Sequence, residues 1–380
     1  MIDELVATNG RLVAPDSVIE GTLRARNGRI VEVAEGRSHV RGALDLEGDW
    51  LLPGLVELHT DNLERQFSPR PGVRWPADAA MLIHDAQVAQ SGITTVGDAV
   101  CVGFHGGKSE RLEYLRFSID VLRRARGADA LKADHFLHLR LELTDPHLLE
   151  LFEPLLGEPA LRLVSLMDHT PGQRQWHDLE RFRSFSLGRG VRTDAEFEEL
   201  VGRRVRDQRL YADRQRAEVL RLLDAHPAVR ASHDDATAEH VALARRSGCS
   251  LSEFPTTLAA AEAARAAGMG IVMGAPNLII GGSHSGNVAA ADLVERGLVD
   301  VLSSDYVPAS LLHAAFLLHE GFGVPMPDAI APMTRAPADQ LGLTDRGRLA
   351  PGMRADLLQV REIGTTPAVV RVWLEGRRIA

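Results

Sequence analysis

The chain has 380 residues, 45% of them hydrophobic and 25% charged, which is the composition of an ordinary globular protein with a large buried core. Its formal net charge of −9 argues against a general binder of nucleic acid or of anionic membrane surfaces. The only cysteines are Cys101 and Cys249, so neither a disulfide framework nor a four-thiolate zinc site can form. The length allows either one large barrel or two domains.

The first residues carry no basic segment followed by an apolar one, so we expect no signal peptide. No uninterrupted apolar run reaches the roughly 18 residues that a membrane span requires. We therefore expect a cytoplasmic protein that binds neither membranes nor nucleic acid.

Both ends of the chain have the pattern of short β-strands. Residues 3–35 alternate apolar and polar side chains, with Asn9-Gly10 and Asn27-Gly28 between the apolar runs. Because Asn-Gly is the strongest short hairpin signal, we expect antiparallel hairpins there. Residues 355–360 and 368–374 also look like strands, so both ends are expected to meet in one small sheet.

The middle of the chain, from about residue 53 to 335, alternates short apolar runs with helical stretches, which predicts a parallel sheet or barrel. Eight candidate strands occur, the number that a TIM barrel requires. These strands are residues 55–59, 94–99, 135–143, 161–168, 229–233, 250–254, 270–274 and 301–304.

Three predicted helices each end before a glycine that suits a C-cap; they span residues 77–90, 256–267 and 289–296. Pro308 fits the first turn of a further helix that extends through Leu318.

The charged segment 171–227 is too long for a simple barrel loop, and we interpret it as an insertion with one or two helices. Thr193-Asp194-Ala195-Glu196 forms a capping-box pattern ahead of a helical run to about Leu223. Most of its charges are expected to face solvent.

Metal-ligand chemistry is first indicated by His59 and Asp61, at the end of an apolar run broken by Pro53-Gly54. Residues i and i+2 of a strand share a face, so both side chains would point into one cavity. Alone, such a pair is more often an ordinary hydrogen-bonded couple.

Other good ligands also fall at the C-terminal ends of predicted strands, where barrel enzymes place their active sites. In residues 138–143 three polar side chains alternate with leucines, and a metal would supply a partner for Glu142 inside the barrel. His169, His233 and Asp305 follow or end later strands. Strand ends bearing His, Asp or Glu in barrel order are hard to explain by packing alone.

At both boundaries of the barrel the chain resembles the amidohydrolase superfamily. The resemblance rests on Leu52-Pro53-Gly54-Leu55-Val56-Glu57-Leu58-His59 at the entry and on residues 347–357 at the exit, and it extends over essentially the whole chain. It implies an α/β fold with a (β/α)8 TIM barrel over residues 53–345, and a small β-sandwich built from residues 1–52 and 346–380.

The resemblance also implies a metal-dependent hydrolase, with two departures from the usual ligands. Asp61 stands where the superfamily usually has the second histidine of His-x-His, and Glu142 is the expected substitute for a carboxylated lysine, because neither Lys108 nor Lys132 lies at a plausible strand end. Carboxylates shift the preference toward Mn or Mg, with Zn and Fe still open. The implied ligands of two divalent ions are His59, Asp61, Glu142, His169, His233 and Asp305.

A closer resemblance is to the diphosphatase subfamily of the carbon-phosphorus lyase pathway. Members of that subfamily hydrolyse alpha-D-ribose 1-methylphosphonate 5-triphosphate to the 5-phosphate and pyrophosphate. The blocks that carry this resemblance are residues 59–64, 69–71, 84–87, 92–96, 167–175, 281–287 and 303–308.

A triphosphate substrate needs guanidinium groups, amides and metal ions around it. We hypothesise that a hydroxide activated by the metals attacks the α-phosphorus while Asp305 accepts a proton. The expected substrate-binding residues are Asn62, Arg70, Gln173, Arg174, Ser283, His284 and Ser285.

Two other hypotheses remain open at this point. The same metal centre would also suit an amidohydrolase that acts on a cyclic amide or an N-acyl substrate, and the barrel would also suit a metal-free scaffold. The sequence decides neither the identity and number of the metals nor whether the chain forms a homo-oligomer.

Overall fold

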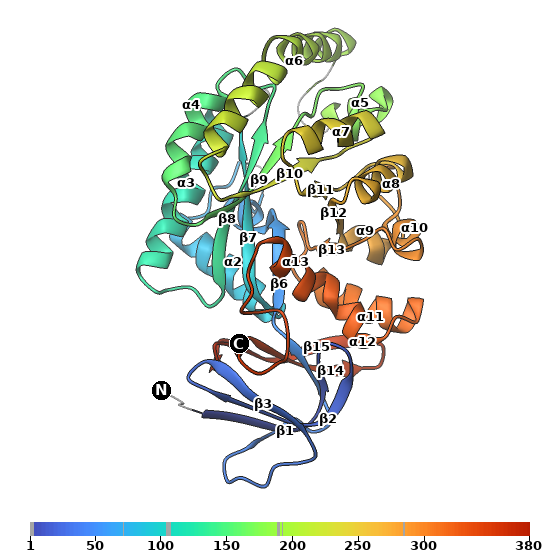
Figure 1. Ribbon diagram of the computed structural model, residues 1–380. Helices are drawn as coiled ribbons and strands as arrows, with labels where there is room; N and C mark the ends of the chain where they lie inside the picture. The colour runs from blue at the N-terminus through green and yellow to red at the C-terminus, as the bar shows by residue number, and fades with distance from the viewer. Residues whose placement is uncertain (1–3, 71, 104–107, 188–190, 192, 284–285) are drawn as a thin grey trace.

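Eight parallel strands form a barrel in the middle of the computed structural model (Figure 1), which describes residues 4–70, 72–103, 108–187, 191, 193–283 and 286–380. The strands pair in chain order, and a parallel bridge between Thr60 and Asp305 joins the last strand to the first. The eight predicted strands are confirmed. They are β6 (Leu55–Thr60), β7 (Ile93–Val102), β8 (Asp134–Glu142), β9 (Leu161–Met167), β10 (Val229–His233), β11 (Leu251–Glu253), β12 (Gly270–Gly274) and β13 (Val301–Ser303).

Apolar side chains fill the lower interior of the barrel. Phe136 is the largest of them, and it fits because β7 has Gly97 beside it: a Cβ at Gly97 would lie 2.6 Å from the Phe136 ring and 2.5 Å from the carbonyl oxygen of Leu58. The barrel is therefore a packed core below its rim rather than a pore. The other strand residues of this cluster are Val56, Leu58, Leu163, Ala231, Leu251, Val272 and Val301.

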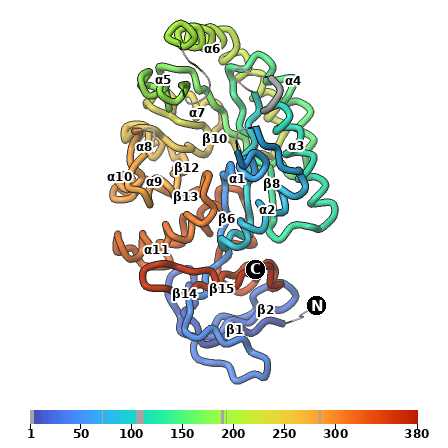
Figure 2. The backbone as a smooth tube through the Cα atoms, turned by 180° about the vertical axis from the view of Figure 1, so that it is seen from behind, coloured from blue at the N-terminus to red at the C-terminus, as the bar shows by residue number. Residues whose placement is uncertain are grey.

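Helices cover the outside of the barrel, as the front and back views show (Figures 1 and 2). None of those in the described residues is long and apolar enough to cross a membrane. They are α1 (Asn62–Phe67), α2 (Ala77–Gln90), α3 (Lys108–Gly127), α4 (Leu148–Phe152), α5 (Leu179–Leu187), α6 (Asp194–Leu223), α7 (Ala238–Arg246), α8 (Leu258–Ala266), α9 (Ala275–Ile280), α10 (Ala290–Glu295), α11 (Ser310–Phe322), α12 (Met326–Ile330) and α13 (Arg335–Gln340).

The three helices predicted from glycine C-caps correspond to α2, α8 and α10. Gly92, Gly268 and Gly297 follow them with φ of 85°, 68° and 66°, in the left-handed region that favours glycine. The placement of Pro308 was wrong: α11 begins at Ser310, so this proline lies in the loop before the helix.

A small sheet unites the two ends of the chain at one end of the molecule (Figure 1). Strand β5 pairs in parallel with β1 and antiparallel with β14, so the N-terminal and C-terminal strands form one sheet, as expected. Its strands are β1 (Glu4–Val13), β2 (Val18–Arg26), β3 (Arg29–Glu35), β4 (Leu44–Asp45), β5 (Trp50–Pro53), β14 (Leu357–Ile363), β15 (Thr366–Leu374) and β16 (Arg377–Arg378).

One of the two Asn-Gly hairpins was wrong. Asn27 and Gly28 connect β2 to β3, but Asn9 and Gly10 lie inside β1 at a register shift. Asn9 has a φ of 61°, and a Cβ at Gly10 would lie 2.5 Å from the Leu46 side chain. The pair serves a β-bulge and a close contact with Leu46 instead of a turn.

The long insertion carries α5 and α6 at the end of the molecule opposite the small sheet (Figure 1). The capping box is confirmed: Thr193 Oγ1 accepts from the backbone N–H of Glu196 at 3.2 Å, and the Glu196 carboxylate accepts from that of Thr193 at 3.1 Å. The helix that follows has 30 residues and ends at Leu223, as predicted.

A buried ionic cluster joins α2 to strands β7 and β8 below the rim of the barrel. His135 lies between two carboxylates, with Nδ1 2.9 Å from Asp98 and Nε2 3.1 Å from Asp85. Burial alone would lower the pKa of His135, but the charge of Asp98 and the hydrogen bond to Asp85 outweigh it and raise the pKa to about 9. His135 is therefore a cation at neutral pH that holds the two carboxylates together.

We predict that His135→Gln lowers the free energy of unfolding by about 3–5 kcal/mol near pH 6, because it removes one partner of a buried ionic cluster. The folded-state pKa of about 9 lies above the ordinary 6.5, so this stabilisation is complete below pH 6.5 and is lost as the pH rises through 9. Chemical denaturation of both proteins from pH 6 to 10 should show their difference shrinking.

The control is His147→Gln, since His147 is exposed and its imidazole is paired with Glu150 at 3.4 Å on the surface of the described structure. It should change stability by less than about 0.5 kcal/mol at every pH. A stability difference for His135→Gln that stays constant across this range would contradict the assignment of a buried imidazolium.

Candidate metal centre

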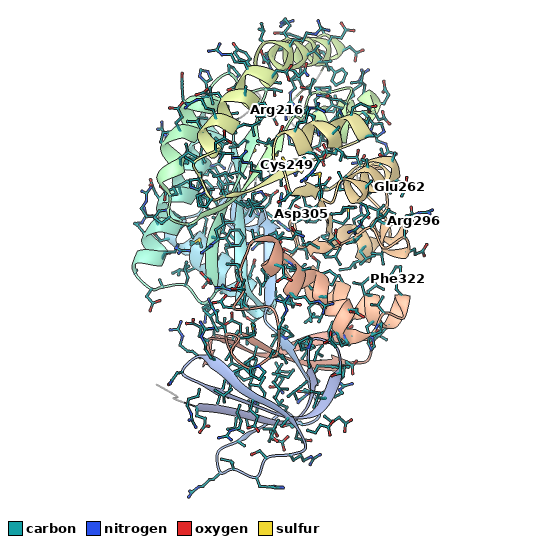
Figure 3. All side chains as sticks on the ribbon, viewed as in Figure 1. Arg216, Cys249, Glu262, Arg296, Asp305 and Phe322 are labelled. Atoms are coloured by element: carbon teal, nitrogen blue, oxygen red, sulfur yellow. The ribbon has the colours of Figure 1, made fainter. Side chains whose placement is uncertain are left out.

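A cavity of about 1230 Å³ opens at the C-terminal ends of the barrel strands. Asp305, labelled in Figure 3, follows β13 at the end of the last barrel strand. All six residues predicted as metal ligands line this cavity: His59, Asp61, Glu142, His169, His233 and Asp305.

The first group of ligand atoms comes from His59, Asp61 and Asp305, which lie within 4.8 Å of one another. The seam of the barrel places them, because the backbone N–H of Asp61 donates to the carbonyl of Asp305 at 2.8 Å and that of Asp305 donates to the carbonyl of His59 at 3.1 Å. Burial and the nearby charge of Asp61 raise the pKa of Asp305. Asp61 and Asp305 repel each other when both are ionised, and a bound cation would relieve this repulsion.

The second group consists of His169, His233 and Asp234, whose ligand atoms also converge within 4.8 Å. Asp234 Oδ2 lies 3.4 Å from Nε2 of His169 and 3.6 Å from Nε2 of His233. Glu142 accepts a hydrogen bond from Nδ1 of His169 at 2.7 Å, which directs Nε2 toward Asp234. Glu142 thus contacts His169 and also lines the cavity, and its expected role as a metal ligand stays a prediction. Sequence reasoning did not select Asp234.

Glu253, at the end of β11, is hydrogen-bonded to one histidine of each group. Its carboxylate accepts from Nδ1 of His59 at 2.9 Å and from Nδ1 of His233 at 3.0 Å, and Ser165 Oγ donates to it at 2.5 Å. Burial would raise the pKa of Glu253, but the neighbouring imidazoles His138 and His59 hold it well below its usual range. One buried carboxylate therefore orients a histidine in each group, so that Nε2 of both rings is left for the cavity.

Sequence reasoning missed Glu253, although the same signal was available for it as for the other ligands. It ends the predicted strand 250–254, as His233 ends the strand before it. A carboxylate at the end of a barrel strand was the criterion that had selected Glu142.

Arg140 lies between the two groups, and the sequence had not assigned it a role. Its Nη1 is 3.0 and 3.1 Å from the two carboxylate oxygens of Asp61, and its Nη2 is 3.5 Å from Nε2 of His233. The guanidinium neutralises part of the negative charge of the cavity.

The donor set fits divalent metal ions. Each group combines imidazole nitrogen with carboxylate oxygen, the ligands that Zn, Mn and Fe take in proteins. Asp234 Oδ2 is buried and receives no hydrogen bond from any described residue, which is the state expected of a ligand atom that awaits a cation.

A third cluster of similar composition is different in this respect. His84, Asp98 and His135 also converge, but the ring nitrogens are already hydrogen-bonded: His84 accepts from Asn62 at 2.9 Å and donates to Asp98 at 2.7 Å. Because the ring nitrogens of this cluster already have hydrogen-bond partners in the protein, the cluster fits a structural network rather than a metal site.

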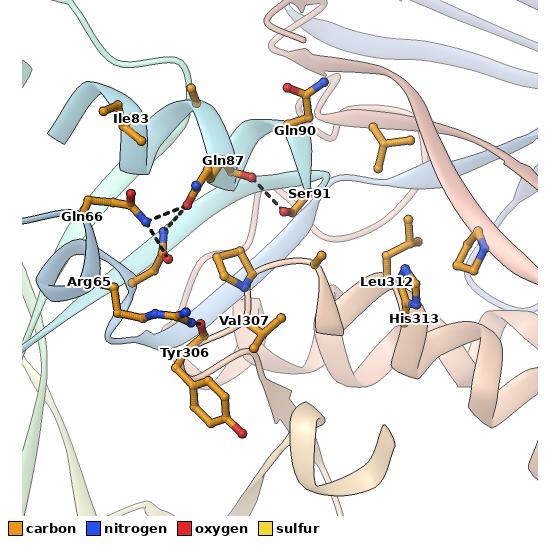
Figure 4. A pocket seen from close by; sticks show the side chains of 16 residues that line it. Arg65, Gln66, Ile83, Gln87, Gln90, Ser91, Tyr306, Val307, Leu312 and His313 are labelled. Atoms are coloured by element: carbon orange, nitrogen blue, oxygen red, sulfur yellow. Dashed lines mark hydrogen bonds between the residues drawn. The ribbon is translucent and has the colours of Figure 1, made fainter. Parts of the chain in front are cut away.

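The expected substrate-binding residues are less well placed than the expected metal ligands. The amide of Asn62 donates to Nδ1 of His84 at 2.9 Å and to Gln87 Oε1 at 3.0 Å, and it accepts from Gln66 at 3.3 Å. Gln66 and Gln87 lie beside a separate cavity of about 740 Å³ (Figure 4). Asn62 is the first residue of α1, and its side chain points toward α2 instead of the metal centre.

Arg174 was expected to reach a phosphate, but the structure commits it elsewhere. Its Nη1 donates to Asp235 at 2.7 Å and to the carbonyl of His233 at 2.9 Å, and the side chain is buried outside the cavity wall. Gln173 and Arg70 do not line the cavity either. Ser283 does, whereas His284 and Ser285 lie outside the described residues.

Comparison with known proteins agrees with this geometry. The sequence model of the amidohydrolase family matches residues 166–380. Over 377 residues the chain is 44% identical to alpha-D-ribose 1-methylphosphonate 5-triphosphate diphosphatase of Escherichia coli (strain K12), covering 99% of this chain and 100% of that protein. The chain belongs to the amidohydrolase family.

Solved structures of this fold lie further away in sequence. N-acetyl-D-glucosamine-6-phosphate deacetylase from Mycobacterium smegmatis superposes with a TM-score of 0.64 at 16% identity, covering 99% of each chain. For 5-methylcytosine deaminase from Klebsiella pneumoniae the TM-score is also 0.64 at 16% identity, covering 99% of this chain and 98% of the other. At this identity they establish the amidohydrolase fold, a barrel with a small sheet from both termini.

We predict that Glu253→Gln lowers the affinity for divalent metal by about 10- to 100-fold. Glutamine offers one acceptor oxygen where glutamate offers two, so one of the two imidazoles loses its orienting partner. Titration of metal-free protein with Zn²⁺ or Mn²⁺ would measure the effect, with circular dichroism to verify folding.

Glu262→Gln is the matched control, because Glu262 is exposed on α8 (Figure 3) and should leave metal binding unchanged. Equal metal affinity in a folded Glu253→Gln protein and in the control would show that Glu253 does not orient the ligands.

Proposed function

We propose that this protein hydrolyses alpha-D-ribose 1-methylphosphonate 5-triphosphate to alpha-D-ribose 1-methylphosphonate 5-phosphate and pyrophosphate. The proposal rests on one observation above all: the 44% identity to a diphosphatase of that name extends over 99% of this chain and 100% of the relative. A cavity with paired imidazole and carboxylate groups supports it, because such a site can accept a polyanion together with divalent cations.

We further propose one divalent ion for each group of ligands, two in all. His59, Asp61 and Asp305 would hold one ion, and His169, His233 and Asp234 the other. Zn, Mn, Fe or Mg would each be compatible, and the share of carboxylates favours Mn or Mg. When bound, the ions would supply positive charge against the phosphate oxygens and lower the pKa of water.

The chain's own residues account for the remaining chemistry. In the hydrolysis a water oxygen bonds to the α-phosphorus, the bond to the bridging oxygen breaks, and its electron pair leaves on pyrophosphate. Asp305 would accept the proton of the water, since its carboxylate lies in the first group and its pKa is raised by burial and by Asp61. Arg140 holds Asp61 in place and limits the repulsion between the carboxylates.

Asp305→Asn should lower the rate of pyrophosphate release by about 10²- to 10⁴-fold, because an amide cannot accept the proton. The measurement uses metal-replete protein and counts bound metal in parallel, since Asp305 is also a proposed ligand. Asp292→Asn, at an exposed position on α10, is the control. Near-normal turnover of Asp305→Asn would remove this residue from the mechanism.

The wild-type protein should release pyrophosphate from the ribose triphosphate and leave cyclic amides intact. The rival amide hydrolysis deserves this comparison because an 85-residue stretch is 40% identical to dihydroorotase of Methanopyrus kandleri, although it spans only 18% of this chain and 20% of that protein. Turnover of a cyclic amide without release of pyrophosphate would reverse the assignment. Metal-free protein that retains full activity would exclude the metal centre.

A further inference from the structure

The helical insertion contributes residues to the lining of the cavity that also contains the metal-ligand groups. Trp176 and Phe185, with ring centroids 4.6 Å apart, form an aromatic part of that lining. From α6 the lining residues are Leu200, Arg203 and Arg204. Positions i, i+3 and i+4 share one face of a helix, so one continuous stripe of α6 faces the cavity.

Two contacts hold α6 firmly against the rim of the barrel. Near its C-terminal end, the buried amide of Gln215 donates to the carbonyls of Leu143 and Asp145 at 2.9 and 2.7 Å, directly after Glu142 in the chain. Nearer its start, Arg204 Nη1 lies 3.4 Å from the carbonyl of His169. The helix is therefore positioned by the strand exits that carry Glu142 and His169.

Four of the arginines that the structure describes line the cavity, and three of them already contact other groups of the protein. Arg140 pairs with Asp61 at 3.0 Å, Arg65 donates to the carbonyl of Tyr306 at 2.6 Å, and Arg204 contacts His169 as described. Arg203 is exposed to the cavity and forms neither a hydrogen bond nor an ion pair with any residue that the structure describes. Its guanidinium is free to bind a ligand.

We propose that Arg203 binds the terminal phosphates of the substrate, the part that leaves as pyrophosphate. This inference rests on the function proposed above. A guanidinium pairs with phosphate through two parallel charge-assisted hydrogen bonds, which makes arginine the preferred residue for this contact. The terminal diphosphate carries more negative charge than the phosphonate ester at the other end of the substrate, and a free cation on a preformed wall favours the more highly charged end.

The insertion would then set the length of the phosphate chain that the enzyme selects. The metal-ligand groups come from the ends of barrel strands and Arg203 from α6, so the α-phosphorus and the departing phosphates would be held by different elements. A contact made from an added helix can change without disturbing the barrel.

The test compares Arg203→Gln and Arg203→Lys with Arg209→Gln, an exposed arginine of α6 that does not line the cavity. Inhibition constants are measured for pyrophosphate, tripolyphosphate and methylphosphonate, along with kcat and KM for the triphosphate substrate. Arg203→Gln should raise the KM and both polyphosphate inhibition constants by roughly 10- to 100-fold, the effect of losing one charge-assisted contact.

Inhibition by methylphosphonate and kcat should not change in Arg203→Gln, Arg203→Lys should recover part of the loss, and Arg209→Gln should match the wild type. General damage to the fold would weaken all three inhibitors together. The proposal would be overturned if Arg203→Gln left the inhibition constants of both polyphosphates unchanged. It would also be overturned if those constants rose no more than the inhibition constant of methylphosphonate.

Failure of this proposal can be told apart from failure of the proposed function. Wild-type protein that releases pyrophosphate while Arg203→Gln behaves like Arg209→Gln would refute only the role of Arg203. If the wild type releases no pyrophosphate, the proposed function falls. Calorimetric binding of tripolyphosphate to metal-loaded protein still decides on Arg203: weaker binding by Arg203→Gln supports the site, and equal binding overturns it.

Discussion

The hydrogen bonds that close the barrel between β6 and β13 are the constraint on which the rest of the structure depends. Glu57 is fully buried at this seam, where its carboxylate accepts from the Ser303 hydroxyl and from the backbone N–H of Ser304, both at 2.6 Å. The backbone bonds beside it bring Asp305 next to His59 and Asp61. The bonds that make the barrel continuous also bring the three residues of the first candidate group together, so an open barrel would separate Asp305 from His59 and Asp61.

Buried charge is handled in two different ways in neighbouring parts of the barrel. In the cluster around His135, each carboxylate has an imidazole or backbone N–H as partner, and the result is a rigid link between α2 and the sheet. At the rim, Asp234 and Asp305 are left with less compensation. The same residue types therefore form a closed network in one place and a candidate ligand site in the other, according to how many of their hydrogen bonds the protein itself satisfies.

The strands could be predicted from the sequence, and so could the convergence of six polar residues on one cavity, because the C-terminal ends of parallel strands meet at one rim. Nothing local determined in which direction each side chain leaves its strand. Asp234 and Asp305 adopt φ of 55° and 52°, and β6 has a register shift between Glu57 and Thr60, features that depend on the assembled barrel. For the same reason Arg174 could be placed near His169 along the chain, while its ion pair with Asp235 could not be foreseen.

The position of β5 has a consequence for how the chain is made. Strand β5 leads through Gly54 into β6, the strand that carries His59, yet its antiparallel partner β14 lies close to the other end of the chain. During synthesis on the ribosome, one edge of β5 must stay unpaired until β14 has emerged, about 300 residues later in the chain. A nascent chain that stalls before β14 would expose this edge beside a partly formed barrel, so β14 must be synthesised before the small sheet can close.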